Sequence, residues 1–152
     1  MAVIYPPTPL QGQHTHRQSI FLAGSIDNGA AENWQARVET HFADRPEYLL
    51  LNPRRAEWDA TWEQTFEHPR FYQQVNWELN GLDAADHIIL YFAPASKAPV
   101  SLLELGLYAA SGKVLLCCPE GYWRRGNVQV VSERYRIPFF DDLDELLQVR
   151  FG

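Results

Sequence analysis

The chain has 152 residues, the size of a single domain, and 46% of them are hydrophobic, which is enough for a sizeable core. Lys and Arg together number 13 against 19 Asp and Glu, so the formal net charge is -6 at pH 7. This charge balance argues against a protein held to a nucleic acid polymer through its phosphates. It leaves a small nucleotide or nucleoside open as a ligand.

The cysteine content and the absence of targeting patterns indicate a compartment. Cys117 and Cys118 are adjacent in an apolar run. Neighbouring side chains of a strand point to opposite faces, so we expect no disulfide between them. No apolar run approaches the roughly 20 residues of a membrane span, and the first residues lack a signal-peptide pattern. We therefore expect a cytoplasmic protein with free thiols.

The first 17 residues are rich in proline and are expected to form a loosely ordered N-terminal arm, with a short strand near residues 3–5. Residues 18–152 are expected to form one domain. His14 and His16 have a spacing that suits metal ligands, but no Cys or acidic residue lies close to them in the sequence, so no metal site is predicted.

Apolar runs and helical spacing alternate along the rest of the chain. Strands are expected over 19–26, 48–53, 85–92, 114–118 and 128–131, with an extended segment over 135–140. Helices are expected over 30–42, 70–83, 100–113 and from 141 onward, and polar or irregular loops over 27–29, 54–62, 94–99 and 119–127. This alternation predicts a three-layer α/β/α sandwich around a mostly parallel, flavodoxin- or Rossmann-like sheet of about five strands.

One acidic residue stands out in this pattern. Glu104 lies among leucines near the start of the 100–113 helix, directly after a buried strand. Ligands of parallel sheets bind where strands end and helices begin, and an ionised carboxylate is costly to bury without a partner. Glu104 is therefore either a nucleophile or general base, or a solvated helix residue in an exposed slot between apolar neighbours.

Other side chains with reactive or binding chemistry have two interpretations each. Glu78 is either a second acid of the same site or part of a surface salt bridge. Asp86 is either a substrate ligand or a polar strand start. In the 54–62 loop, Asp59 suits contact with a base or sugar, and Trp58 and Trp62 suit either stacking on a flat ligand or the core.

The arginines of the 54–62 loop and the glycine that ends the first strand are candidate phosphate-binding features. Arg54 and Arg55 suit either a phosphate or local acids such as Glu57. Gly24 closes the first strand, but the chain has neither a dinucleotide G-x-G-x-x-G pattern nor a P-loop lysine. No Ser-His-Asp signature and no metal-ligand spacing occur either, so the sequence predicts carboxylate chemistry without a cofactor or metal.

Three segments in order carry a family resemblance: Phe21–Ile26, Trp77–Leu82 with Ala85-Asp86, and Leu103–Gly106 with Ser111–Lys113. Together they resemble the nucleoside 2′-deoxyribosyltransferases and their relatives, which include the 2′-deoxynucleoside 5′-monophosphate N-hydrolases. The resemblance covers roughly residues 19–131 and is strongest over 76–119.

The resemblance implies roles for particular residues. Glu104 matches a nucleophile that attacks the anomeric carbon of a nucleoside and forms a covalent glycosyl-enzyme intermediate. Glu78 matches a catalytic aspartate near the base and is one methylene longer. The substrate-binding positions implied or suggested are Phe21, Gly24, Ser25, Ile26, Trp58, Asp59, Asp86, Ser101 and Asn127. The family implies that Asn127 is supplied by a neighbouring subunit of a homo-oligomer.

The chain also departs from the family pattern. Phe21 stands where the family often has a tyrosine that orients the nucleophile, and Tyr5, Tyr91 and Tyr108 are candidate substitutes. Ala98 stands where the transferases carry an acid for the sugar 5′-hydroxyl, and Ser96 or Ser101 are candidate substitutes. Either serine would also suit a 5′-phosphate.

The resemblance implies cleavage of the N-glycosidic bond of a nucleoside or deoxynucleoside, with transfer of the sugar to another nucleobase. Hydrolysis of a nucleoside or its 5′-monophosphate is the alternative within enzymes. A nucleotide-binding module without turnover is the alternative of another class. The expected partner is a small nucleoside or nucleobase, with no nucleic acid polymer and no membrane.

Overall fold

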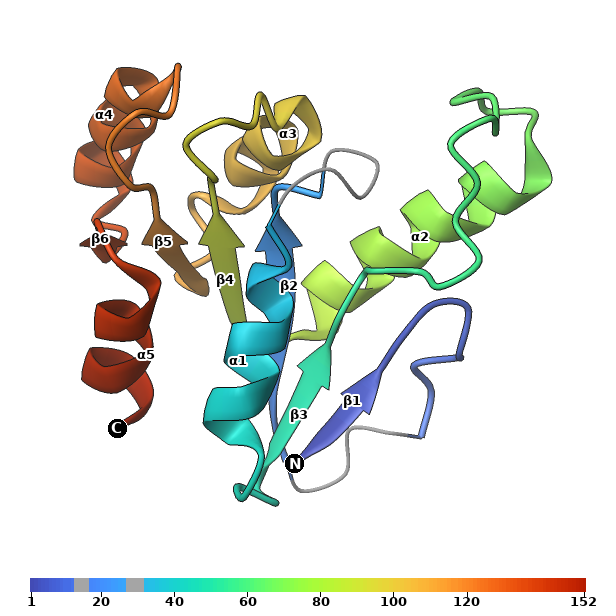
Figure 1. Cartoon of the computed structure of the whole chain (residues 1–152), viewed down its shortest axis with the longest axis horizontal. Helices are drawn as coiled ribbons and strands as arrows, with labels where there is room; N and C mark the ends of the chain where they lie inside the picture. Colours follow the sequence, from blue (N-terminus) through green and yellow to red (C-terminus); the bar gives the residue numbers. More distant parts are fainter. Residues whose placement is uncertain (13–16, 27–31) are drawn as a thin grey trace.

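The computed structural model describes residues 1–12, 17–26 and 32–152. Its strands are β1 (Ala2–Ile4), β2 (Gln18–Gly24), β3 (Tyr48–Leu51), β4 (His87–Tyr91), β5 (Val114–Cys117) and β6 (Phe139–Phe140). Its helices are α1 (Trp34–Phe42), α2 (Pro69–Ala84), α3 (Pro99–Tyr108), α4 (Arg125–Tyr135) and α5 (Leu143–Phe151). Figure 1 shows this order along the chain.

The strands described form one sheet of six, in the order β1-β3-β2-β4-β5-β6, and every neighbouring pair is parallel. The order of β2 to β6 is flavodoxin-like, and β1 adds a strand at the edge beside β3. The predicted α/β fold class is confirmed, with six strands where about five were expected. The chain leaves β2 for β3 on one side and then crosses to β4 on the other, so the topological switch point of this sheet lies at β2.

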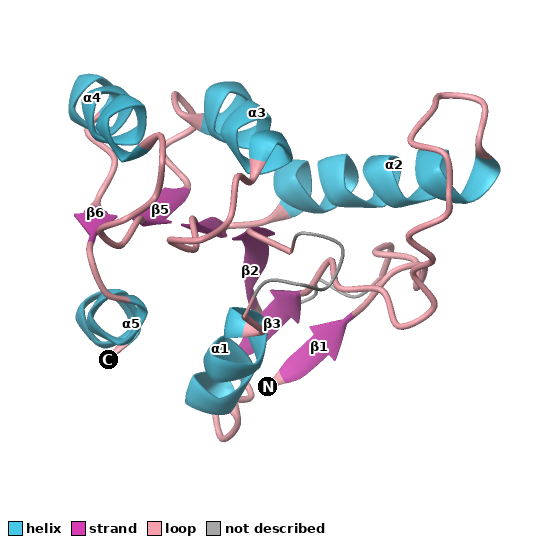
Figure 2. Ribbon diagram, turned by 45° about the horizontal axis from the view of Figure 1, so that its top comes forward, coloured by secondary structure: helices cyan, strands magenta, loops and turns pink. Residues whose placement is uncertain are grey.

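Helices cover both faces of the sheet (Figure 2). On one face, α1 and α5 bury Trp34, Val38, Phe42 and Leu146 against Ile20 and Leu22 of β2 and its neighbours. On the other face, α2, α3 and α4 bury Trp77, Leu82, Leu105 and Val128 against Phe21 and Ala23. Successive residues of β2 thus face opposite layers, as strand geometry requires, and the uninterrupted apolar run at 20–23 follows from burial on both faces.

The start of α2 shows local signals that agree with the fold. Pro69 occupies the first turn, where its missing N–H costs nothing, and His68 Nδ1 accepts a hydrogen bond from the Phe71 N–H at 3.2 Å. At α5, Asp142 caps the helix by accepting from the Glu145 N–H at 2.9 Å. The acidic first turn of α5 suits the positive end of the helix dipole, as expected from the sequence.

One predicted element is wrong. The segment 128–131 was expected as a strand because Val128, Val130 and Val131 are β-branched, but it lies inside α4. In the helix, Val128 and Ser132 are buried one turn apart while Val130 is exposed. The topology explains the difference: β5 and β6 are parallel neighbours, and parallel neighbours need a crossover connection, which α4 provides.

The N-terminal segment contributes to the sheet and to its packing. The strand expected near residues 3–5 is present as β1 and pairs with β3. Trp77 of α2 donates its indole N–H to the Thr8 carbonyl at 2.8 Å. The expected loop 27–29, the first residues of the expected 30–42 helix, and His14 and His16 lie outside the described residues.

Candidate active site

A cavity of about 580 Å³ lies at the carboxyl-terminal edge of the sheet. It is bounded by the ends of β2 and β3, by the middle of α2 and by the first turns of α3. This is the switch-point crevice, where ligands of open α/β sheets bind, and its volume suits a small organic molecule. This cavity is therefore the candidate ligand site of the chain.

Glu104 and Glu78 line this cavity from two helices. Glu104 is on α3, and Glu78 is on α2, where its Oε1 accepts a hydrogen bond from Gln74 Nε2 at 3.2 Å. Within the described part of the chain, the Glu104 carboxylate has no hydrogen-bond partner, so it is available to a ligand.

Burial disfavours the charged form of both carboxyls. It raises the pKa of Glu78 to about 7, against the smaller lowering effect of the Gln74 amide. Burial raises the pKa of Glu104 to about 8, and the negative charge of Glu78 adds to the increase. Since each charge opposes the other, the pair holds one proton most readily near neutral pH. Because Glu104 binds its proton more tightly than Glu78, the singly protonated pair carries that proton mostly on Glu104. The arrangement that a nucleophile and an acid partner would need, with Glu104 ionised and Glu78 protonated, is the minor form of the same pair.

The end of β2 forms the floor between these acids. Gly24 has a φ of +143°, and a Cβ there would come within 2.3 Å of the Tyr91 carbonyl oxygen, so only glycine fits. Ser25 is buried, and its hydroxyl accepts from the Ala93 N–H at 3.0 Å and donates to the Tyr91 carbonyl at 3.4 Å. The Ser25 hydroxyl thus fastens β2 to β4, although Gly24, Ser25 and Ile26 all line the cavity as expected.

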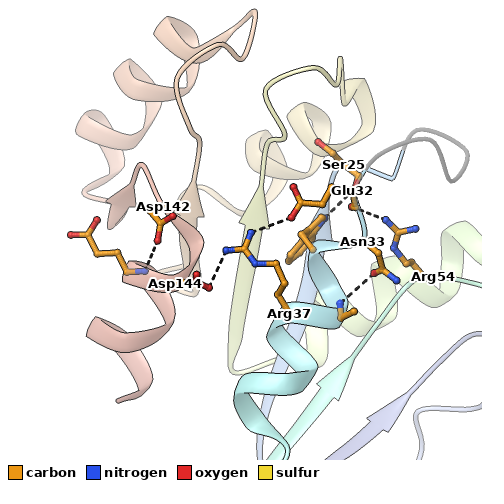
Figure 3. A network of polar contacts seen from close by, with 10 residues as sticks. Ser25, Glu32, Asn33, Arg37, Arg54, Asp142 and Asp144 are labelled. Atoms are coloured by element: carbon orange, nitrogen blue, oxygen red, sulfur yellow. Dashed lines mark hydrogen bonds and ion pairs between the residues drawn. The ribbon is translucent and has the colours of Figure 1, made fainter.

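The loop after β3 contributes Arg54, Arg55 and Trp58 to the cavity wall. Arg54 donates to the Gln35 side-chain oxygen at 2.8 Å and to the Glu32 carbonyl at 3.0 Å. Figure 3 shows the contact between Arg54 and the Glu32 carbonyl. The network continues through the Glu32 carboxylate to Arg37 and on to Asp144. The network ties the loop to α1 and α5.

The side chain of Arg55 is largely buried. Its side chain is 5% exposed and pairs with the 54% exposed Glu57 at 3.2 Å. The guanidinium also lies 5.2 Å from the centre of the Trp62 ring, which packs edge-on against Trp58. Of these two tryptophans, Trp58 lines the cavity.

Three residues proposed from the sequence lie outside the cavity wall. Asp86 is at the opposite, amino-terminal end of β4, where its carboxylate accepts from the Ser19 N–H and hydroxyl, both at 2.8 Å. Asp59 is exposed and caps its own loop by accepting from the Thr61 N–H at 2.8 Å. Asn127 is exposed on α4. Asp86 and Asp59 thus do not line the cavity of this chain, and their roles in substrate binding, like the role of Asn127 across a subunit interface, stay predictions.

The positions that depart from the family pattern lie at the cavity or close by. Phe21 and Ala98 line it, and Ala98 adopts the left-handed conformation with a φ of +45°. Ser101 is buried and lines the cavity in the first turn of α3, whereas Ser96 does not line it.

None of the candidate tyrosines hydrogen-bonds Glu104 among the described residues. Tyr108 donates to Asp83 at 2.6 Å and Tyr5 to Glu39 at 2.7 Å, while Tyr91 packs against Trp34 on the opposite face of the sheet.

Sequence reasoning missed two polar residues of the cavity wall, Gln74 and Gln64. Gln74 is buried, lines the cavity and lies one helical turn before Glu78. Its amide N–H₂ donates to Glu78 and to the Pro53 carbonyl, the latter at 3.0 Å. The signal was present in the i, i+4 spacing of an amide and a carboxylate on one helix face. Gln64, Phe71 and Val75 also line the wall.

The fold and the site define a doubly wound α/β protein with two buried carboxyls at its ligand-binding edge. A family model described as "Nucleoside 2-deoxyribosyltransferase like" matches residues 17–122, and the chain belongs to this family. The matched region contains both glutamates and the loop after β3.

Comparison with individual proteins supports the fold and no particular function. A crystal structure of a conserved protein from Enterococcus faecalis V583 matches with a TM-score of 0.50 and 15% sequence identity. The match covers 88% of this chain and 86% of that one. No curated protein matches. Among the described residues, no helix combines the length and apolar character required to cross a lipid bilayer.

Proposed function

We propose that this protein cleaves the N-glycosidic bond of a nucleoside or deoxynucleoside and transfers the sugar to a second nucleobase. The observation that carries the proposal is the pair of glutamates, Glu104 and Glu78, lining one cavity at the sheet's switch point. Family membership supports nucleoside-type ligands.

The chemistry follows that of retaining glycosidases. An oxygen of the ionised Glu104 carboxylate forms a bond to C1′ of the sugar as the C1′–N bond breaks, and the bonding electron pair leaves with the base. The Glu78 carboxyl donates its proton to a nitrogen of the departing base. A second base then enters, gives its proton to Glu78 and attacks C1′, which releases Glu104.

The nucleophile is tested by substitution. Glu104→Gln should reduce cleavage of deoxyinosine by at least about a thousandfold, because the amide cannot form the glycosyl ester. Glu133→Gln on the exposed surface of α4 is the matched control and should cleave normally. Full activity in Glu104→Gln would end the proposal.

The intermediate and its acceptor are tested separately. A 2-fluoroarabinosyl nucleoside should add the mass of its sugar to a peptide that contains Glu104, as read by mass spectrometry. Deoxyinosine is then incubated alone and with a mixture of other nucleobases. New deoxynucleosides formed only with the mixture indicate transfer, and hypoxanthine released without acceptor indicates hydrolysis. Binding without either product indicates a module without turnover.

A further inference from the structure

One of the two cavity carboxyls is held in place by a neighbouring amide. Gln74 lies on α2 one turn before Glu78 and is 5% exposed. Its Nε2 group donates to Glu78 Oε1 at 3.2 Å and to the Pro53 carbonyl at 3.0 Å. Because Pro53 follows closely after the end of β3, the amide links the middle of α2 to that strand and has little freedom to turn.

The orientation of this amide follows from its two acceptors. A flipped amide would set its oxygen against the oxygens of Pro53 and Glu78, so the N–H₂ group must face them. The Gln74 oxygen is then buried and has no hydrogen-bond partner in the described part of the chain. A buried acceptor without a partner is costly, and an apolar side chain would avoid that cost. The presence of an amide at position 74 is best explained by what its N–H₂ group does to Glu78.

The contact with Gln74 decides which oxygen of Glu78 carries the proton. The carbonyl oxygen of a protonated carboxyl is its better acceptor, so Oε1 remains the acceptor for the amide and the proton lies on Oε2. Glu78 lines the cavity, and its Oε2 has no hydrogen-bond partner among the described residues. The proton is thus held on the oxygen that is left free for a ligand.

We propose that Gln74 is a positioning residue for Glu78, whose amide fixes the carboxyl with Oε2 free for the departing base and stabilises the carboxylate that forms when the proton leaves. This role rests on the proposed function, in which Glu78 is the acid. As the C1′–N bond breaks, its electron pair stays with the base, the Oε2 proton moves to a base nitrogen and Glu78 becomes negative. A hydrogen bond to a charged acceptor is about twice as strong as one to a neutral acceptor, so the contact strengthens during the step.

The amide also acts on the protonation of the pair. Donation from Gln74 favours the carboxylate of Glu78 and opposes the rise in pKa that burial causes. It therefore favours the form with the proton on Glu104, while it makes a protonated Glu78 a stronger acid. The contribution of Gln74 is thus to the orientation and the strength of the acid, and not to the abundance of the productive form.

Nuclear magnetic resonance of isotope-labelled protein tests the contact without turnover. The carboxyl signal of Glu78 is identified by its absence in Glu78→Gln. In Gln74→Met, which has a similar volume and no donor, this carboxyl should titrate at a midpoint at least about 0.5 pH units higher than in wild type. Gln73→Met, at the exposed neighbouring position, is the matched control and should leave the midpoint unchanged. An unchanged midpoint in Gln74→Met would overturn the proposal.

The wild-type protein provides a second test that does not depend on a variant of Gln74 that folds. The side-chain N–H signals of Gln74 should shift with pH at the same midpoint as the Glu78 carboxyl, because the amide stays bonded to Oε1 while the carboxyl loses its proton. This dependence should disappear in Glu78→Gln. Gln74 signals that are insensitive to pH in wild type would also overturn the proposal.

Activity separates positioning of the acid from a structural role. Deoxyinosine needs a proton on its leaving base, whereas the base of 7-methyl-2′-deoxyguanosine already carries a positive charge and leaves as a neutral molecule. In Gln74→Met, the rate on deoxyinosine divided by the rate on the methylated nucleoside should fall at least about tenfold, after correction for the reaction without enzyme. An equal loss on both substrates would indicate a structural role and end the proposal.

Failure of this inference can be told from failure of the proposed function. A wild-type protein that cleaves no nucleoside would end the proposed activity and the role of Gln74 in it. A protein that cleaves deoxyinosine through Glu104, and whose rate ratio is unchanged in Gln74→Met, would leave the activity standing and end the role of Gln74 alone.

Discussion

At the scale of single residues, the burial of the two cavity glutamates makes the stability of the fold depend on pH. No cationic side chain of the described residues lowers the pKa of Glu78 or Glu104, and burial raises the pKa of both. A carboxyl whose pKa rises on folding binds its proton more tightly in the folded protein than in the unfolded chain. The stability that such a carboxyl contributes through its proton is complete below its ordinary pKa. This contribution is lost as the pH rises through the pKa of the folded protein.

This argument predicts how Glu78→Gln changes stability. Between pH 4.5 and about 7 the wild-type protein loses the effect of Glu78, whereas the variant has no such carboxyl to lose. The variant should gain unfolding free energy relative to wild type as the pH rises, reaching a difference on the order of 3 kcal/mol at pH 8. Urea denaturation at several pH values measures it, with Glu133→Gln as control. Parallel pH curves for wild type and Glu78→Gln would contradict the prediction.

Activity should also depend on the protonation of the pair. In the proposed mechanism turnover requires Glu104 ionised and Glu78 protonated, so the rate should fall on both sides of a maximum in the neutral range, with apparent pKa values that belong to the pair. In Glu78→Gln the alkaline fall should disappear, because the group that loses its proton there is absent. An unchanged bell-shaped profile in this variant would exclude Glu78 as the acid.

At the scale of elements, the ends of β2 and β4 are held together where the site begins. Gly24 approaches the Tyr91 backbone, and the Ser25 hydroxyl contacts the Tyr91 carbonyl and the Ala93 N–H. The Trp34 indole donates to the Ser25 carbonyl at 3.1 Å and ties α1 to the same point. These contacts set the position of the cavity floor.

Gly24→Ala should therefore destabilise the protein strongly. The added Cβ would meet the Tyr91 carbonyl oxygen at 2.3 Å, and the φ of +143° is strained for any L residue with a side chain. We expect a loss of about 3 kcal/mol or more in unfolding free energy. Gly126→Ala in α4 is the matched control, since nothing lies within 4 Å of its Cβ and alanine favours a helix. Equal stability of the two variants would show that the strand ends adjust.

The sequence predicted most elements because their signals were local and strong. The apolar run at 20–23 and the apolar stripe of α2 are examples, and the acid at 104 stood out within its helix. The helix at 125–135 could not be found in this way, because Val128 to Val131 favours a strand locally and the crossover between β5 and β6 is a property of the whole sheet. The contact of Asp86 could not be predicted for a similar reason: Asp86 precedes β4 at the edge of the sheet away from the cavity, and its partner Ser19 is 67 positions away in the sequence.

At the scale of the whole molecule, α3 presents an apolar face to solvent. Val100, Leu103 and Leu107 are 58%, 63% and 57% exposed and lie along one side of the helix that carries Glu104. Exposed apolar patches of this kind mark interaction sites. The family resemblance implies a homo-oligomer, and this face, close to the cavity, is our candidate for the contact with a second copy.

Leu103→Lys combined with Leu107→Lys should convert the oligomer to a monomer of 17.5 kDa in light scattering after size-exclusion chromatography. Burying two ammonium groups in an interface is costly, whereas both groups are solvated in the monomer. Val149→Lys, at an exposed position on α5 on the opposite face of the sheet, should leave the assembly unchanged. A wild-type protein that is already monomeric, or a double variant that stays assembled, would contradict this assignment.

The loop between β3 and α2 is held less tightly by regular secondary structure than the floor of the cavity is. Residues 52–68 contain neither helix nor strand, yet they supply Arg55 and Trp58, while Gly24 and Ser25 are bound into the sheet. The loop and the end of β2 thus shape the cavity from separate stretches of chain, and only the second is fixed by the sheet. We expect the loop to tolerate substitution while the edge of the sheet stays intact. A library confined to residues 54–64 should therefore yield many folded proteins, and a library at 24–25 very few.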